Sequence, residues 1–299
     1  MTTQEQVQKQ DEKAHGRNHQ PPSDLVFYLA FGTIAAAYVA LILIVLMADT
    51  AFTSVPEVLR VLQDRDIQYS IKLSLLSCTV TALLSVLVAV PVGYLLSRHL
   101  MSQEQDRYAD QTRLRKSRAW VGHLVDTVID VPIVLPPLVI GLSLLILFRF
   151  WPFRYVDRQV TYEIPAVIIA QFMVASAFAV RTMRVTFDQI TPRHEQIAWT
   201  LGCNRGQAFW KVALPAARRG IMAAATLAWA RALGEFGPIL VFAGATRGRT
   251  EVLSTTVFLE LSIGRLEAAI AVSLLMVVAA VVVLVLTRIL GLGLWGGKP

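Results

Sequence analysis

The feature that most constrains this chain is a series of long apolar runs bounded by charged residues. The runs 25–48 and 73–97 contain no charged residue over 24 and 25 positions. A helix needs about 20 apolar residues to cross a bilayer. The two runs therefore predict membrane-spanning helices, and they exclude an ordinary soluble domain.

Four further stretches are predicted to cross the membrane, namely 131–148, 164–180, 220–246 and 268–287. Only 16% of the 299 residues are charged, whereas soluble domains average roughly a quarter. The prediction is an all-α polytopic membrane protein with six transmembrane helices in one domain, 25–291. The ends 1–24 and 292–299 are polar or short, and we expect them to be cytoplasmic tails, the first of them disordered.

Lys and Arg residues are unevenly divided between alternate loops. The N-terminal tail, the loops 98–127 and 181–219 and the end after 287 hold eighteen of them, and the three opposite loops hold eight. Positive residues accumulate on the cytoplasmic side. Both termini are therefore predicted in the cytoplasm, in a multi-pass protein of the cell (inner) membrane. The same loops account for the net charge of +7, so no nucleic-acid partner is expected.

Motifs for catalysis or metal binding are lacking. His194 and Glu195 begin a zinc-helix pattern, but Ala198 stands where the second histidine is needed. The stretch 244–250 is glycine-rich, yet it has neither the spacing nor the lysine of a phosphate-binding loop. We therefore expect no catalytic residue, no metal and no nucleotide site in this chain.

The third predicted span is interrupted by Pro132, Pro136 and Pro137. Membrane helices tolerate such breaks where neighbouring groups or a cavity satisfy the freed carbonyls. A kink beside a pathway and a kink that serves only packing are both open. Pro136, Pro137 and Phe236 are candidates for a gate, although an aromatic residue such as Phe236 often faces lipid or the core.

The loop 181–219 is predicted to form two helices. Pro192 is suited to a helix start with Thr191 as its cap. The residues Ile190, Ile197 and Leu201 form an apolar stripe, and Gly202 permits a sharp helix end. A second helix, 207–213, is expected to stop before Pro215. An amphipathic surface helix is the plain alternative at this stage.

The segment EQIAWTLGCNRGQAFWKVALP (195–215) resembles the cytoplasmic signature of binding-protein-dependent ABC transporter permeases. That signature has an acidic-Ala-Ala start, a glycine four residues later and a Leu-Pro ending thirteen residues after the glycine. The matching positions are Glu195 or Gln196, Ile197, Ala198, Gly202, Leu214 and Pro215. The match departs from the family at its start, because Gln196 occupies the acidic position and Glu195 stands one residue early.

The resemblance implies a type I ABC importer permease fold, with a coupling helix inside the loop 184–217. It also implies a separate ATPase subunit that binds ATP and Mg, an extracytoplasmic anion-binding protein, and a second permease copy. The permease itself would contact membrane lipid and need no cofactor.

Three further stretches, 135–141, 230–244 and 249–275, resemble the branch that serves tetrahedral oxyanions, above all molybdate. Sulfate and tungstate remain alternatives. An ion-coupled secondary transporter and a membrane assembly protein are the rival classes.

The fifth predicted span carries the charged residues Arg231 and Glu235, four positions apart on one helix face. Charges inside a membrane helix face the bundle interior or a cavity. The two residues are expected to pair, either along the translocation pathway or as a structural pair.

Overall fold

The computed structural model describes residues 25–105 and 113–293, and its regular elements in those ranges are helices. The predicted all-α class is confirmed for this part of the chain. The predicted tail 1–24, most of the tail 292–299 and the centre of the charged insert 101–118 lie outside the described residues. The chain divides after Phe52 into two units: the helix α2 (Leu25–Phe52) is the described part of the first, and the second begins at Thr53.

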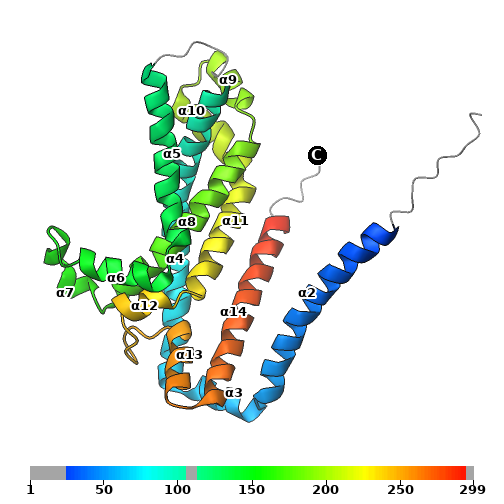
Figure 1. The fold of residues 1–299 in the computed structure, drawn as a ribbon, viewed down its shortest axis with the longest axis vertical. Coiled ribbons are helices and arrows are strands. Elements are labelled where there is room, and N and C mark those ends of the chain that lie inside the picture. The colour runs from blue at the N-terminus through cyan, green and yellow to red at the C-terminus, as the bar shows by residue number, and fades with distance from the viewer. Residues whose placement is uncertain (1–24, 106–112, 294–299) are drawn as a thin grey trace, which may run out of the picture. The chain divides into compact units, whose positions relative to one another are not determined.

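Four long helices run side by side in the second unit (Figure 1). They are α4 (Arg65–Gln105), α5 (Arg113–Val134), α8 (Ile164–Gln189) and α11 (Leu214–Leu233). The helix α14 (Leu266–Gly293) packs against α11 and α13 (Leu253–Ser262). The short elements are α3 (Val55–Gln63), α6 (Pro137–Leu147), η2 (Phe153–Tyr155), α7 (Asp157–Val160), α9 (Arg193–Thr200), α10 (Arg205–Ala208), η3 (Phe209–Ala213) and α12 (Gly237–Phe242).

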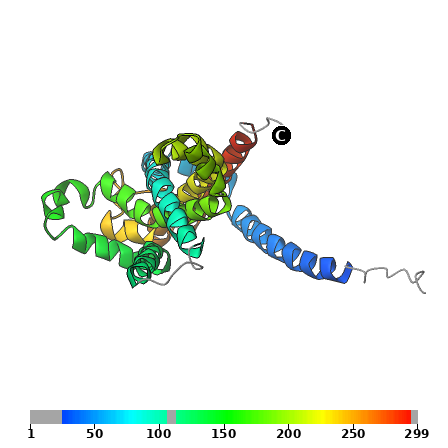
Figure 2. The same ribbon diagram turned by 90° about the horizontal axis from the view of Figure 1, so that it is seen from above.

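The short elements gather at different places along this unit. The helices α9 and α10 lie at one end of the bundle, and α3 and α13 lie at the other (Figure 1). Seen from above, α6 and α12 run across the bundle direction rather than along it (Figure 2).

Within the described ranges 25–105 and 113–293, four helices are long and apolar enough to cross a membrane: Phe27–Phe52, Arg65–Arg98, Ile164–Asp188 and Leu266–Ile289. The bent pair formed by Leu124–Val134 and α6 makes a fifth span if it is counted as one. The helix α11 is 20 residues long but carries Arg218, Arg219 and Arg231, so its composition alone does not single it out. The protein is therefore a multi-pass membrane protein.

The third predicted span, 131–148, is not one helix. It consists of the end of α5 and the whole of α6, which meet at an angle of 111°. Pro136 precedes α6 in an extended conformation, and Pro137 is the first residue of α6. A residue before proline is pushed out of the helical region, so both Leu135 and Pro136 disfavour continuation of α5.

The fifth predicted span, 220–246, is also divided. The helix α11 begins earlier, at Leu214, and ends at Leu233, while α12 starts at Gly237. The predicted stop before Pro215 is wrong, because α10 and η3 lead directly into α11. Pro215 is the second residue of α11, which directly follows the π-helical turn η3, so the helical path continues through it.

Small residues let the long helices of the bundle approach closely. A Cβ on Gly93 of α4 would lie 2.8 Å from the Cβ of Met183 in α8. A Cβ on Gly220 of α11 would lie 2.1 Å from the Thr186 hydroxyl. Such contacts are typical of membrane helices. Small residues let the backbones approach closely, and the resulting van der Waals packing holds the helices together where lipid provides no hydrophobic driving force.

Candidate functional site

The predicted coupling segment ends its first helix at Gly202. This residue has a φ of +89°, and no other group would contact a Cβ placed on it. The N–H of Gly202 donates to the Trp199 carbonyl, and the N–H of Cys203 donates to the Ala198 carbonyl at 2.9 Å. These two bonds form a Schellman motif, so the predicted sharp helix end is confirmed.

Local hydrogen bonds also fix the start of the next helix, α10. The Asn204 side chain accepts from the Gln207 N–H, and the Gln207 side chain accepts from the Asn204 N–H. This capping box was not predicted, although a glutamine three residues after an asparagine is its sequence signature. The predicted Thr191 cap of α9 is absent, since Pro192 precedes the helix without a side-chain bond.

Two of the three residues in the predicted apolar stripe face outward, whereas Ile190, before α9, is partly buried against the core. The Ile197 side chain is 57% exposed and Leu201 is 79% exposed, and the neighbouring Trp199 and Trp210 are also exposed. The buried residues of α9 are Glu195 and Ala198. The helix therefore presents an apolar face away from the bundle and a carboxylate toward it.

Glu195 is bound inside the chain rather than offered to the surroundings. Its Oε2 accepts from the Tyr94 hydroxyl at 2.6 Å, and its Oε1 accepts from Nε and Nη2 of Arg98 at 2.9 and 2.5 Å. Glu195 is only 2% exposed, whereas Gln196 is exposed. The sequence match leaves Glu195 as the only acidic residue at the start of the segment, and the structure turns this carboxylate toward α4 rather than outward.

Arg98 also binds the C-terminal end of α8. Its Nη1 donates to the carbonyls of Phe187 and Ile190, each at 3.2 Å. The Tyr94 ring packs edge-on against Phe187 and against Phe209 of η3. Neither Arg98 nor Tyr94 was singled out from the sequence. The only signal in the sequence was their spacing of four residues at the end of the second predicted span.

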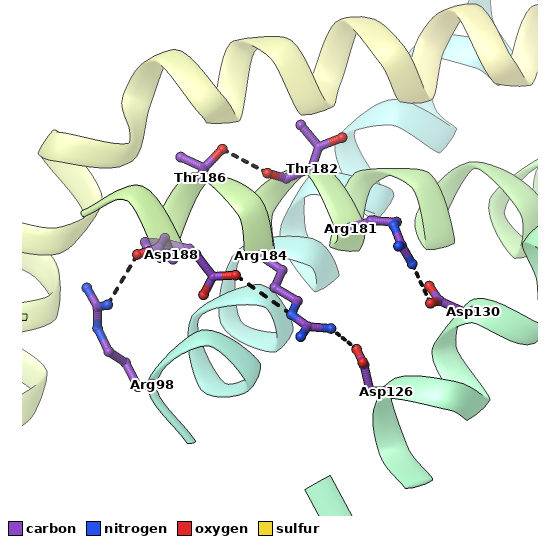
Figure 3. A network of polar contacts seen from close by, with 9 residues as sticks. Arg98, Asp126, Asp130, Arg181, Thr182, Arg184, Thr186 and Asp188 are labelled. Carbon is purple, nitrogen blue, oxygen red and sulfur yellow. Dashed lines mark hydrogen bonds and ion pairs between the residues drawn. The ribbon is translucent and has the colours of Figure 1, made fainter. Parts of the chain in front are cut away.

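A row of ion pairs joins α5 to α8 (Figure 3). Arg184 pairs with Asp126, and Arg181 pairs with Asp130. Asp188 lies 3.9 Å from Arg184 on the same helix. Because the two aspartates of α5 are four residues apart, they share one face of that helix and hold it beside α8 up to the bend.

The two broken spans meet at their breaks. A Cβ on Gly237 of α12 would lie 2.9 Å from the Cβ of Pro137, and a Cβ on Gly141 of α6 would lie 2.8 Å from the Cα of Pro238. Each break therefore supplies a proline against the other's glycine. The structure thus brings the candidate Pro137 next to the segment that carries the other pathway candidates.

Arg231 and Glu235 form the expected ion pair, with 2.8 Å between Nη1 and Oε2. The Glu235 side chain is 1% exposed and that of Arg231 is 30% exposed. The Arg231 guanidinium also lies 5.6 Å from the centre of the Phe178 ring. The pair stands at the end of α11, where the backbone leaves the helix.

The helix α13 contacts the break between α11 and α12. The Ser254 hydroxyl donates to the Glu235 carbonyl at 2.7 Å, and the Phe236 and Phe258 rings lie 5.2 Å apart. A buried amide, Gln171 of α8, donates to the Ala232 carbonyl and accepts from the Thr81 hydroxyl. The end of α11 is thereby tied to α4, α8 and α13.

A third buried carboxylate, Glu251, lies before α13 and is 1% exposed. Burial raises the pKa of this carboxyl above its ordinary value of 4.5, and the nearby charges of Asp66 and Glu260 raise it further. The Thr256 hydroxyl and Arg247 act in the opposite direction. Among the residues that the structure describes, no group of three or more His, Cys, Asp or Glu could hold a metal ion.

The model of the family described as binding-protein-dependent transport system inner membrane component matches residues 109–294. The chain belongs to this family. Solved structures of a bacterial alginate ABC transporter share the fold, and the chain in the complex with an alginate pentasaccharide-bound periplasmic protein has a TM-score of 0.60 at 18% identity. That match covers 88% of this chain and 93% of the other, so the predicted permease fold is confirmed.

Curated relatives in this family are transport permeases for several anions. The molybdate/tungstate transport system permease protein WtpB of Pyrococcus abyssi is 30% identical, over 73% of this chain and 77% of its own length. The molybdenum transport system permease protein ModB of Mycobacterium tuberculosis is 29% identical, over 91% and 96%. The sulfate transport system permease protein CysT of Escherichia coli K12 is 29% identical, over 86% and 90%.

Proposed function

We propose that this protein is the membrane subunit of an ATP-driven ABC importer for a tetrahedral oxyanion, with molybdate as the leading substrate. Family membership and the exposed apolar face of α9 carry the proposal. A lone surface helix would bury that face, whereas here Ile197 and Leu201 stand free of the bundle. An exposed apolar patch of this kind marks a protein interaction site.

The occupant of that face is a separate ATPase subunit, which binds ATP and Mg. Gln196 is exposed on α9 beside the apolar residues, and Gly202 ends the helix at an open edge. Leu214 and Pro215 join the segment rigidly to α11. The variant Gly202→Asp is expected to weaken ATPase binding while the permease stays in the membrane. Unchanged binding and uptake in this variant would leave the segment as a surface helix only.

The pathway is assigned to the paired breaks of the third and fifth spans. Pro136 precedes α6 and Pro137 is its first residue, while Phe236 precedes α12. The ion pair of Arg231 and Glu235 lies at the end of α11. Backbone breaks at membrane depth are tolerated where they line a cavity or are buried in protein. In this proposal two copies of the chain place their breaks around one passage.

The substrate rests on two observations. The relatives named above carry molybdate, tungstate or sulfate in their names, and the stretches 135–141, 230–244 and 249–275 resemble that branch. The test is uptake of labelled molybdate by vesicles that contain the permease with its ATPase and an anion-binding protein. Uptake should require ATP and be blocked by unlabelled molybdate, with tungstate and sulfate as competitors. Uptake without ATP or without a copurifying ATPase would indicate an ion-coupled transporter instead.

The proposal includes a topology with both termini in the cytoplasm, which the division of Lys and Arg between alternate loops supports. A reporter that is active only outside the cytoplasm should be active when fused after Ala51, and it should be silent after Gln103 or Lys298. Activity after Lys298 would require an odd number of crossings, which contradicts this topology.

A further inference from the structure

Glu195 is a charged group that α9 buries on the side opposite to its exposed apolar face. Its carboxylate receives three donors from two side chains of α4, and none of these comes from α9 itself. A carboxylate that has left water is tolerated only when its partners satisfy both oxygens. Both oxygens of Glu195 are satisfied, so the contact is specific rather than incidental.

The partners of Glu195 connect three elements at one point. Arg98 bonds Glu195 of α9 and, at the same time, two carbonyls at the end of α8. Tyr94 adds ring contacts to Phe187 of α8 and to Phe209 of η3. The helix α9 is therefore held to α4 and α8 by side chains, independently of the backbone connection at 190–192.

We propose that Glu195, held by Arg98 and Tyr94, is a positioning residue that makes α9 move as one body with α4 and α8. The proposal rests on the proposed function, because the force on α9 comes from the docked ATPase. The apolar face receives that force, and the buried carboxylate passes it to the two helices. Glu195 itself touches no partner subunit.

The first experiment needs no partner. Amide hydrogen exchange of α9 is measured in the full-length permease and in the variants Glu195→Gln and Tyr94→Phe. Exchange in α9 should become roughly tenfold faster in Glu195→Gln, because the charged link to Arg98 is lost while α8 keeps its own helix bonds. Tyr94→Phe removes one donor and retains the ring contacts, so its effect should be smaller and of the same sign. His194→Gln, an exposed neighbour on α9, is the matched control and should not change exchange.

The second experiment uses the permease with the copurified ATPase and compares ATPase affinity with anion uptake per ATP hydrolysed. In Glu195→Gln the affinity should stay within about threefold of wild type, while uptake per ATP should fall about tenfold. A weaker affinity with unchanged uptake per ATP would overturn the proposal, since Glu195 would then be a partner contact.

Unchanged α9 exchange in both Glu195→Gln and Tyr94→Phe would also overturn the proposal. If Glu195→Gln folds poorly, the exchange of Tyr94→Phe decides alone. Failure of the wild-type permease to bind any ATPase would instead refute the proposed function. The exchange measurement would in that case still decide whether Glu195 holds α9 to the bundle.

Discussion

Two buried carboxylates on this chain have nearly equal exposure and very different surroundings. Glu195, at the α9 end, accepts three hydrogen bonds from Arg98 and Tyr94. Glu235, at the end of α11, has an ion contact with Arg231, but its Oε2 receives no hydrogen bond from the described residues. One site is fully satisfied, and the other is not.

The difference separates a firmly held site from a less firmly held one. When all hydrogen bonds of a buried charged group are made inside the chain, any movement that separates the group from its partners destabilises the protein. Among the described residues, the Glu235 carboxylate is held by one side chain, Arg231, whereas Glu195 is held by two, so fewer contacts fix the position of Glu235. In the mechanism proposed above, the α9 end transmits motion through its firmly held carboxylate, and the break after α11 is the less firmly held of the two regions.

The largest expected effect comes from breaking the satisfied site. Arg98→Met leaves Glu195 as a buried charge without its cation, which should lower the free energy of unfolding by about 3 to 5 kcal/mol. The double variant Arg98→Met with Glu195→Gln should recover most of this loss, because no unpaired charge remains. Denaturation of the purified permease in detergent measures both values.

Equal losses in the single and double variants would contradict this account. They would mean that Arg98 stabilises the protein through its bonds to the Phe187 and Ile190 carbonyls and not through Glu195.

The second effect concerns the less satisfied site. Arg231 is partly exposed, so water can replace some of its interactions, and Arg231→Met or Glu235→Gln should each cost only about 1 to 3 kcal/mol. The double variant should recover the folded amount of protein. Uptake per folded transporter then separates the two roles of the pair, because a pathway role for Arg231 requires uptake to stay low in the double variant.

A value near wild type would make Arg231 and Glu235 a structural pair. We expect this outcome, since a carboxylate at 2.8 Å makes Arg231 a weak attractor for a dianion.

The same two regions show how far the sequence leads. Long apolar runs predicted the long helices, and the Gly-to-Pro spacing of 202–215 indicated the coupling segment, because both signals are local. The prolines predicted a kink in the third span, but averaged hydropathy hid the full break after Val134 and the break after Leu233. Single residues such as proline and glycine decide where a helix ends. A predicted span, by contrast, comes from hydropathy averaged over about 20 residues, which hides such positions.

The residues next to Glu195 in the sequence do not predict which way its side chain points. Its partner Arg98 lies 97 residues away, and the apolar stripe of α9 suggested the opposite face as the buried one. Which face of α9 is buried depends on where α4 ends relative to α9. That relation is tertiary, and no periodicity in 190–201 contains it.

A third, smaller effect tests the helix end separately from the carboxylate. Gly202→Ala places a Cβ on a residue with positive φ, which should cost about 1 kcal/mol. Gly206→Ala is the matched control, because Gly206 is helical and the nearest group to its Cβ would be the Asn204 side chain at 3.6 Å. The control should be neutral or slightly stabilising. A combined Gly202→Ala and Arg98→Met loss far from the sum would show that the helix end and the buried link are coupled.

The smallest effect is a pH dependence at Glu251, whose surroundings are intermediate between those of Glu195 and Glu235. Because burial raises its pKa in the folded protein, the folded state holds its proton more tightly than the unfolded state. The contribution to stability is complete below about pH 4.5, the ordinary value, and is lost as pH rises through the raised pKa. Thermal unfolding midpoints measured from pH 4 upward should therefore fall less steeply in Glu251→Gln than in wild type.

The exposed Glu267→Gln serves as control and should retain the wild-type slope. Identical slopes for wild type and Glu251→Gln would show that Arg247 and Thr256 fully offset the burial of this carboxyl.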